Sequence, residues 1–325
     1  MRNGFVLALA LIAAAEAAAT NPLVGDWAFD VEGAHWLRIA EIADGTFSAQ
    51  MLWNGSPEKM TDVQVAGGLF RASRILDRNE TVQYVPGVRE TFAFLKTDGL
   101  HLTIADFDLQ GRSLTNTLTA VARRIPPVGP APDLSAIEFG TPVDLLKDGL
   151  EGWDECPNGN PFLWTFSDGV LENAHCQEKR RGANLRTQRD DFLDFNLVCE
   201  VRLPPKGNSG IYLRGRYEIQ LADSISRALD EHAMGAYYGR VAPSVRAEKA
   251  ADEWQTLDIT LCERHLTVVL NGVTVIDNAP VTGVTGGAVD SDDFSAGPIV
   301  LQGDHSGVAI RKAVLRPVIK EMRGK

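Results

Sequence analysis

Alternating apolar and polar residues mark most of this chain and predict a protein built from β-strands. The stretch NSGIYLRGRYEIQLAD, residues 208–223, is the clearest case, because its apolar side chains fall on one face of a strand. Such alternation is typical of a strand that buries one side. The other face carries hydrogen-bonding side chains, namely Tyr212, Arg214, Arg216, Glu218 and Gln220. This polar face is either solvated or binds a ligand.

A proline-rich segment divides the strand-like runs into two groups. Residues 125–136 favour an extended spacer rather than packed structure. Before it, over residues 20–124, short apolar runs recur about every ten residues, which is typical of a small sandwich or barrel. The triplet Gly25-Asp26-Trp27 is similar to the opening of lipocalin-type barrels. We therefore expect a small β-domain ahead of the spacer.

The part after the spacer, residues 137–325, is also rich in alternating runs. DFNLVCEVRL and WQTLDITLC alternate, and Asn271-Gly272 forms a hairpin signal between two β-branched runs. Residues 224–231 allow one short helix. Many antiparallel strands in a segment of this length predict an all-β fold with a jelly-roll sandwich.

The first residues and the charge balance bear on location and partners. Residues 1–19 combine Arg2, a short apolar core and a run of alanines, which is the pattern of a secretory signal peptide. We expect a periplasmic or secreted protein without membrane insertion. Lys and Arg number 32 against 43 Asp and Glu, a net charge of −11, which argues against nucleic acid as a partner.

Four cysteines remain outside the signal peptide. None belongs to a Cys-x-x-Cys pair, which disfavours a zinc site made of cysteines. Because export permits disulfides, pairing of Cys156 with Cys176 is the first prediction. Cys199 continues an apolar strand face and is predicted to be a buried free thiol.

Two further clusters favour a ligand-binding role for the polar face. HAMGAYYGRVAP contains Tyr238, and LQGDHSGVAIR contains an Asp304-His305 pair between glycines. A histidine beside an aspartate in such a loop suits acid–base chemistry or metal ligation. Aromatic faces pack against sugar rings, and polar groups bind hydroxyls. The candidate substrate-binding residues of a sugar groove are Tyr212, Arg214, Arg216, Gln220, Tyr238, Gln302 and Arg311.

Several motifs, in order along the chain, carry a resemblance to a known family. NSGIYLRGRYEIQLAD, GAYYGRVAP, EWQTLDITL and GPIVLQGDHSGVAIR resemble the 3-keto-disaccharide hydrolase domain family over residues 140–318. The resemblance implies a concanavalin A-like jelly roll that acts on glycosides oxidised at C3 of the sugar. Ser306 departs from it, since a glycine is expected after the Asp-His pair. The site implied by the resemblance comprises Arg214, Glu218, Gln220, Asp304, His305 and Arg311.

The chemistry that this resemblance implies is elimination. A ketone at C3 acidifies the C2 proton, so a base can remove it while the C1 substituent leaves, with or without later addition of water. Glu218 and His305 are each candidates for the base or the acid, and Asp304 could orient His305. Arg214 or a bound cation could hold the enolate oxygen. A divalent metal ion is therefore a candidate cofactor, with Glu218, Asp304 and His305 as adequate ligands.

Two other functions stay open from the sequence. A non-catalytic carbohydrate-binding module would need only the Tyr and Arg face. A classical retaining glucanase would carry a Glu-x-Asp-x-x-Glu strand, which is not found here. The enzyme hypothesis requires that the Asp304-His305 pair face Glu218 across one groove.

Overall fold

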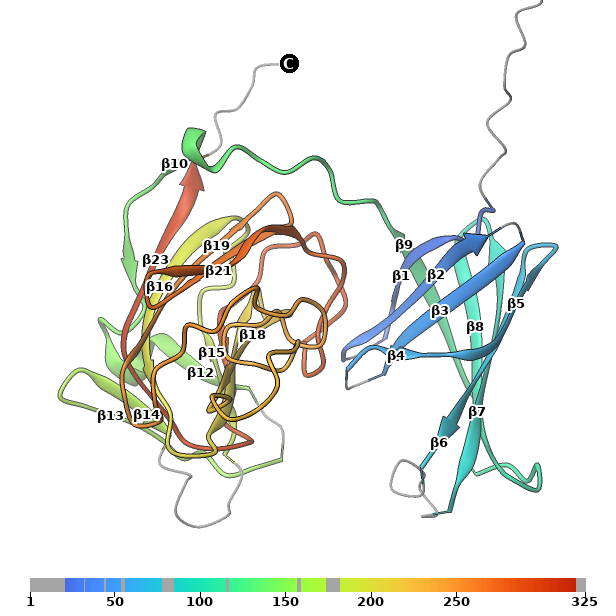
Figure 1. Ribbon diagram of the computed structural model, residues 1–325, viewed down its shortest axis with the longest axis horizontal. Coiled ribbons are helices and arrows are strands. Elements are labelled where there is room, and N and C mark those ends of the chain that lie inside the picture. The colour runs from blue at the N-terminus through green and yellow to red at the C-terminus, as the bar shows by residue number, and fades with distance from the viewer. Residues whose placement is uncertain are drawn as a thin grey trace, which may run out of the picture.

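The computed structural model describes residues 21–31, 33–43, 45–53, 56–77, 85–114, 117–156, 159–173 and 182–319. Within these ranges the fold is all-β, as predicted: a concanavalin-like jelly-roll sandwich preceded by a barrel-shaped sheet (Figure 1). No helix in them has the length and apolar character needed to cross a membrane. The predicted signal peptide, residues 1–19, lies outside the described residues.

The first sheet is an up-and-down barrel in which the first strand meets the last. β1 pairs antiparallel with both β2 and β9. β4 and β5 are the two ends of the strand order, with β4 paired to β3 and β5 paired to β6. Between β4 and β5, the Met60 amide donates to the Ala49 carbonyl at 2.9 Å. The strands are β1 (Gly25–Phe29), β2 (His35–Ala43), β3 (Thr46–Trp53), β4 (Glu58–Lys59), β5 (Thr61–Ala66), β6 (Leu69–Leu76), β7 (Gly87–Lys96), β8 (Gly99–Asp108) and β9 (Leu118–Ile125).

The jelly roll consists of two packed sheets. One runs in the order β13-β14-β23-β16-β19-β20-β21, with β10 and β11 also pairing with β23. Its strands are β10 (Glu138–Phe139), β11 (Val143–Asp144), β13 (Trp164–Ser167), β14 (Val170–Asn173), β16 (Phe195–Arg202), β19 (Gln255–Cys262), β20 (His265–Leu270), β21 (Val273–Pro280) and β23 (Val308–Ile319). The other runs β12-β15-β22-β17-β18, from β12 (Trp153–Cys156), β15 (Asn184–Thr187), β22 (Val300–Leu301), β17 (Asn208–Leu213) and β18 (Tyr217–Ala222). Short 3-10 turns are η2 (Leu134–Ala136) and η3 (Gly149–Gly152).

The β17–β18 hairpin explains the two-faced stretch of the sequence. Ile211 pairs with Ile219, and both are fully buried in the core between the sheets. Tyr212 pairs with Glu218, so these two side chains lie together on the opposite face. The alternation in the sequence therefore separates an apolar face from a polar face, and both faces are buried here.

Residues 224–231 form turns instead of the expected short helix. The guanidinium of Arg246 donates to the carbonyls of Ser224 and Arg227, at 2.8 and 2.7 Å. These bonds hold the segment as turns against the residues around Arg246, and this tertiary contact outweighs local helix propensity.

The core supports one cysteine prediction. Cys199 is buried on β16, and burial raises the pKa of its thiol to about 12. Pairing of Cys156 with Cys176 stays a prediction, because Cys176 lies outside the described residues.

Core packing of the jelly roll gives a stability prediction. Leu257 on β19 is fully buried, so Leu257→Ala should lower the free energy of unfolding by about 2–5 kcal/mol through lost burial and the cavity left behind. Leu229, which is 39% exposed, provides the matched control: Leu229→Ala should change it by less than about 0.5 kcal/mol. Urea denaturation followed by circular dichroism measures both. Equal losses for the two variants would contradict the placement of β19 in the core.

Candidate functional site

A cavity of about 220 Å³ opens beside the polar face of the β17–β18 hairpin. We call it the hairpin pocket. Of the residues that the sequence singled out, it brings together Tyr212, Glu218, Tyr238, Gln302, Asp304 and His305. The remaining lining residues are Asn184, Asn208, Gly286 and Gly287. The Asp304-His305 pair thus borders the same pocket as Glu218, which is the arrangement that the enzyme hypothesis requires.

Glu218 lies at the floor of the pocket and is 3% exposed. Its backbone is fixed on both sides: the amide donates to Thr285 Oγ1 at 3.0 Å, and the carbonyl accepts from the Tyr238 amide at 3.0 Å. Burial raises the pKa of the Glu218 carboxyl to about 8, and the hydrogen bond with Tyr212 only partly offsets this. The carboxyl is therefore mostly protonated at neutral pH and can donate a proton.

Gly210 makes room for this side chain. A Cβ atom at position 210 would overlap Oε1 of Glu218, because the two residues lie on adjacent strands of the hairpin. A residue without a side chain is needed at this position for the carboxyl to occupy its buried place.

Tyr212 is held rigidly next to Glu218. Its hydroxyl donates to the Gly286 carbonyl at 3.1 Å and accepts from Gln302 Nε2 at 3.1 Å. Burial, with the nearby negative charge of Glu218, holds the pKa of the Tyr212 phenol well above its usual range. Tyr212 is therefore a neutral hydrogen-bonding group.

The Asp304-His305 pair forms the rim of the pocket. His305 Nδ1 lies 2.7 Å from Asp304 Oδ1. When the proton sits on Nδ1, this nitrogen donates a hydrogen bond to the aspartate. Nε2 then keeps a lone pair that can act as a base. The His305 side chain is 43% exposed, so a ligand can reach it from the solvent side.

Ser306, the residue that departs from the family resemblance, anchors this loop. Its Oγ accepts from the Asn208 amide at 2.7 Å and donates to the Asn208 carbonyl at 2.8 Å. A glycine could not make these bonds. The departure therefore ties the Asp304-His305 loop to the start of β17 through a side chain.

The sequence reasoning missed Asn184, which reaches the pocket through strand pairing. Leu185 on β15 pairs with Leu301 on β22, which places Asn184 beside the loop that follows β22. Asn184 Oδ1 accepts from the Gly303 amide at 2.8 Å, so its NH₂ group remains as a donor. Nothing in the local sequence around Asn184 indicates this pairing. The part of the pocket wall formed by Gly286 and Gly287 was also missed, and the two adjacent glycines were its only local signal in the sequence.

Arg214 and Arg216 do not line the pocket, contrary to the sequence-based expectation. β17 ends at Leu213, and Arg214 adopts a φ of +54°, so a turn interrupts the alternation. Arg214 donates to the Asp293 carbonyl at 2.7 Å, and Arg216 binds both carboxylate oxygens of Asp290, at 2.6 and 2.9 Å. The two arginines hold the loop that contains these aspartates, and neither is placed to stabilise an enolate.

Gln220 and Arg311 also lie outside the pocket lining. Gln220 is buried further along β18, where its backbone bonds Ala236. Arg311 belongs to β23 in the other sheet; its Nε donates to Glu200 Oε2 at 2.6 Å and its guanidinium lies 4.3 Å from the centre of the Trp254 ring. The sequence does not show which sheet β23 joins, and this explains the error for Arg311.

Comparison with known proteins identifies the larger domain. A family model described as a 3-keto-alpha-glucoside-1,2-lyase-like domain matches residues 143–316. The chain belongs to this family. The match covers the jelly-roll strands from β11 to β22 and most of β23, including every strand that contributes to the hairpin pocket.

Solved structures similar to the lyase-like domain come from carbohydrate-related proteins. A proposed glycosyl hydrolase of Parabacteroides distasonis ATCC 8503 is 25% identical, with a TM-score of 0.45, covering 60% of this chain and 94% of that one. A second from the same organism is 21% identical, with a TM-score of 0.42, covering 55% and 100%. Porphyranase B of Zobellia galactanivorans is 9% identical, with a TM-score of 0.37, covering 59% and 97%. No curated protein matches the chain.

The donor set of the lyase-like domain does not form a metal cluster. Among the residues that the structure describes, no group of three or more His, Cys, Asp or Glu side chains is placed to hold a metal ion. Asp304 Oδ1 lies 2.7 Å from His305 Nδ1, so this carboxylate already has a partner. The described residues therefore present no preformed group of three such ligands, and the candidate divalent ion stays a prediction.

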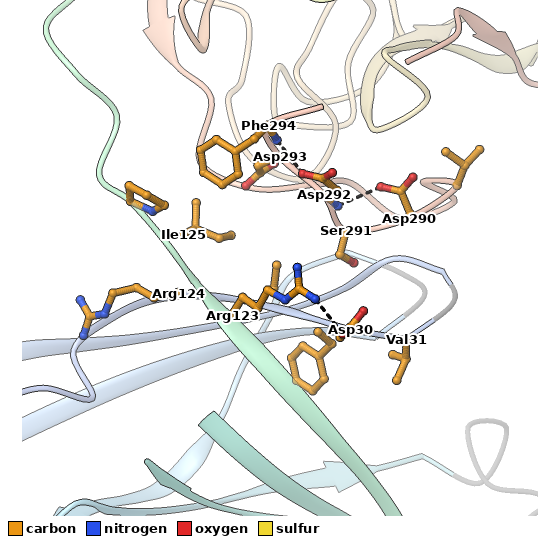
Figure 2. Close-up of a pocket in the computed structure, with 14 residues that line it drawn as sticks. Asp30, Val31, Arg123, Arg124, Ile125, Asp290, Ser291, Asp292, Asp293 and Phe294 are labelled. Atoms are coloured by element: carbon orange, nitrogen blue, oxygen red, sulfur yellow. Dashed lines mark hydrogen bonds and ion pairs between the residues drawn. The ribbon is translucent and has the colours of Figure 1, made fainter. Parts of the chain in front are cut away.

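A larger cavity, of about 770 Å³, lies where the barrel meets the jelly roll (Figure 2). Its charged groups pair within the protein: Asp30 with Arg123 at 3.2 Å, and Asp290 with Arg216. Asp292 accepts from the Phe294 amide at 2.9 Å. Size alone would favour this cavity, but the hairpin pocket combines a protonated carboxyl with a base, and we assign the chemistry there.

The buried carboxyl predicts how stability depends on pH. Glu218 has a pKa of about 8 in the folded protein against an ordinary 4.5, so between these values the folded state binds more protons than the unfolded state. The free energy of unfolding should therefore fall as pH rises from about 4.5 to about 8, by on the order of a few kcal/mol. Glu218→Gln should remove this contribution.

Urea unfolding of both proteins at pH 5, 6.5 and 8 measures the effect. The stability of the parent protein relative to Glu218→Gln should decrease steadily across this series. A constant difference between the two would show that Glu218 does not titrate with a raised pKa.

Proposed function

We propose that this protein is an exported carbohydrate-active enzyme that cleaves 3-keto-glycosides by β-elimination. The observation that supports this most strongly is the pairing, in one pocket, of the largely protonated Glu218 with the Asp304-His305 pair. Elimination needs one base and one acid, which this pocket supplies, and does not need the two opposed carboxyl groups of an ordinary glycosidase.

His305 is the base in this mechanism. Asp304 orients the ring through Nδ1, and Nε2 removes the proton at C2, which the C3 ketone has made acidic. The electron pair of the C2–H bond first delocalises onto the ketone oxygen as an enolate. It then forms the C1=C2 double bond as the C1–O bond breaks.

Glu218 is the acid. Its proton passes to the departing C1 oxygen, so the leaving group departs as a neutral alcohol and the carboxylate remains. Solvent then takes a proton from His305 and returns one to Glu218. The products are an unsaturated keto-sugar and the alcohol, and addition of water across C1=C2 gives the net products of hydrolysis.

The pocket also offers neutral donors for the enolate oxygen. Asn184 lines the pocket, and the hydrogen bond from the Gly303 amide to its Oδ1 fixes the orientation of its NH₂ donor group. Preorganised donors of this kind stabilise charge that develops in the transition state. Asn184 takes the role for which the sequence had suggested Arg214, which the structure places elsewhere.

A non-catalytic sugar-binding module is the second candidate. Tyr238 at the pocket wall is an aromatic group with a sugar-packing face. This function would not require a protonated carboxyl and a base beside the same cavity, and the arrangement of Glu218 and His305 therefore favours the enzyme.

Cleavage assays test the proposal. Purified protein should cleave a 3-keto-glucoside and leave the unoxidised parent glucoside intact, because only the ketone acidifies C2. Assays with and without a chelator test the candidate metal ion separately. If a panel of 3-keto-glycosides with different leaving groups and added divalent ions gives no cleavage, while binding is measurable by calorimetry, the binding-module function replaces the enzyme.

Variants test the assigned roles. His305→Ala and Glu218→Gln should each lower kcat about 10²–10⁴-fold, the usual contribution of general acid–base catalysis. Arg311→Ala is the matched comparison, because Arg311 lies on the opposite sheet and its loss should leave kcat within about twofold. A large loss for Arg311→Ala with little loss for His305→Ala would contradict the assignment to the hairpin pocket.

A further inference from the structure

The barrel contacts both loops that wall the hairpin pocket. We call residues 232–240 the Tyr238 loop and residues 282–291 the Gly286 loop. Ser56 Oγ lies 3.4 Å from His232 Nε2 in the first. In the second, Ser291 Oγ accepts from the His35 amide at 2.9 Å and donates to the Gly33 carbonyl at 3.0 Å. Two separate segments of the barrel therefore reach the walls of the pocket.

Trp36 on β2 is the centre of this contact. It is 1% exposed and belongs to the apolar cluster of the jelly roll rather than to the barrel interior. A Cβ atom at Gly283 would lie 2.7 Å from Trp36 Nε1, and Gly283 has a φ of +107°. The Gly286 loop therefore runs directly against the indole ring, at a position where a side chain would collide with it.

Arg240 joins the two loops beneath Trp36. It belongs to the Tyr238 loop, and its guanidinium lies 4.3 Å from the centre of the Trp36 ring and 5.9 Å from that of Tyr237. Arg240 Nε donates to the Val284 carbonyl at 2.9 Å, and Nη1 donates to the Thr282 carbonyl at 3.0 Å. Attraction of the guanidinium to both rings restricts its orientation, and the carbonyls that it binds are restricted with it.

The next residues of the Gly286 loop contact the backbone of Glu218 and the side chain of Tyr212. Thr285 Oγ1 accepts from the Glu218 amide at 3.0 Å and donates to the Arg216 carbonyl at 3.1 Å. The Gly286 carbonyl accepts from the Tyr212 hydroxyl at 3.1 Å. A continuous series of contacts thus runs from Trp36 through Arg240 and the Gly286 loop to the backbone of Glu218 and the hydroxyl of Tyr212.

We propose that Trp36 is a positioning residue of the catalytic pocket and that the barrel is part of the catalytic unit. Trp36 orients Arg240, which fixes the Gly286 loop and thereby the backbone of Glu218 and the neighbouring Tyr212 hydroxyl. This inference rests on the proposed function for its effect on rate, while the bracing of the loop is a structural property that can be measured independently. Small misplacements of a catalytic group cost large factors in rate.

Trp36→Leu in the full chain tests the proposal against a matched control. Phe70→Leu also replaces a buried aromatic residue of the barrel, 2% exposed, but Phe70 belongs to the barrel interior. Trp36→Leu should lower kcat for a 3-keto-glucoside at least about tenfold with a smaller change in KM. Phe70→Leu should keep kcat within about twofold at a similar loss of Tm. Trp36→Phe, which keeps a flat ring beneath Arg240, should restore part of kcat.

Amide hydrogen exchange gives a readout that does not need activity. Trp36→Leu should increase exchange at the Glu218 amide and in residues 282–287, whereas Phe70→Leu should not. If the two variants behave alike in kcat and in exchange, the proposal is wrong. If Trp36→Leu does not fold, Trp36→Phe against Phe70→Leu decides by the same two measurements. An inactive parent protein would overturn the proposed function, and the exchange data would still decide whether Trp36 braces the loop.

Discussion

The burial of the Glu218 carboxyl is the constraint on which the site depends. An ionised carboxylate loses its hydration on burial, and the hydrogen bond with Tyr212 offsets only part of that loss. The nearby Asp304 carboxylate adds repulsion, so the protonated form is favoured. One unfavourable placement therefore yields an acid that is available at neutral pH, next to a histidine that can act as a base.

The surrounding fold makes this placement possible. Gly210 leaves the space for the side chain, and Thr285 fixes the backbone of β18 from outside the sheet. Burying an acid costs stability, and the apolar faces of β17 and β18, with Ile211 and Ile219 fully buried, offset that cost. The Gly286 loop is in turn braced by the barrel through Trp36, so the smaller domain contributes to the geometry of a pocket that it does not line.

The sequence predicted the strands well and the site only in part. Alternation located β16 to β21 and most barrel strands, because one-sided burial leaves a period of two in the sequence. It also placed Tyr212 and Glu218 on one face, while the Asp304-His305 loop was added from its residue types and the family resemblance. The prediction was wrong for Arg214 and Arg216. The alternating pattern continues in the sequence across a turn, although the backbone has already left the strand there. The expectation for Arg311 was wrong and Asn184 was missed for another reason, since each position depends on long-range strand pairing that no local pattern shows.

The fate of the C2 hydrogen tests the central claim most directly. A 3-keto-glucoside deuterated at C2 would be cleaved in ordinary water, with the products followed by NMR and mass spectrometry. Elimination by His305 and Glu218 predicts that the label leaves C2 during cleavage and that the sugar product carries hydrogen there after rehydration, or a C1=C2 double bond without it. The control is the same labelled sugar incubated with His305→Ala, which measures the loss of deuterium that occurs without cleavage. Cleavage that proceeds with full retention of deuterium at C2 would contradict the elimination mechanism.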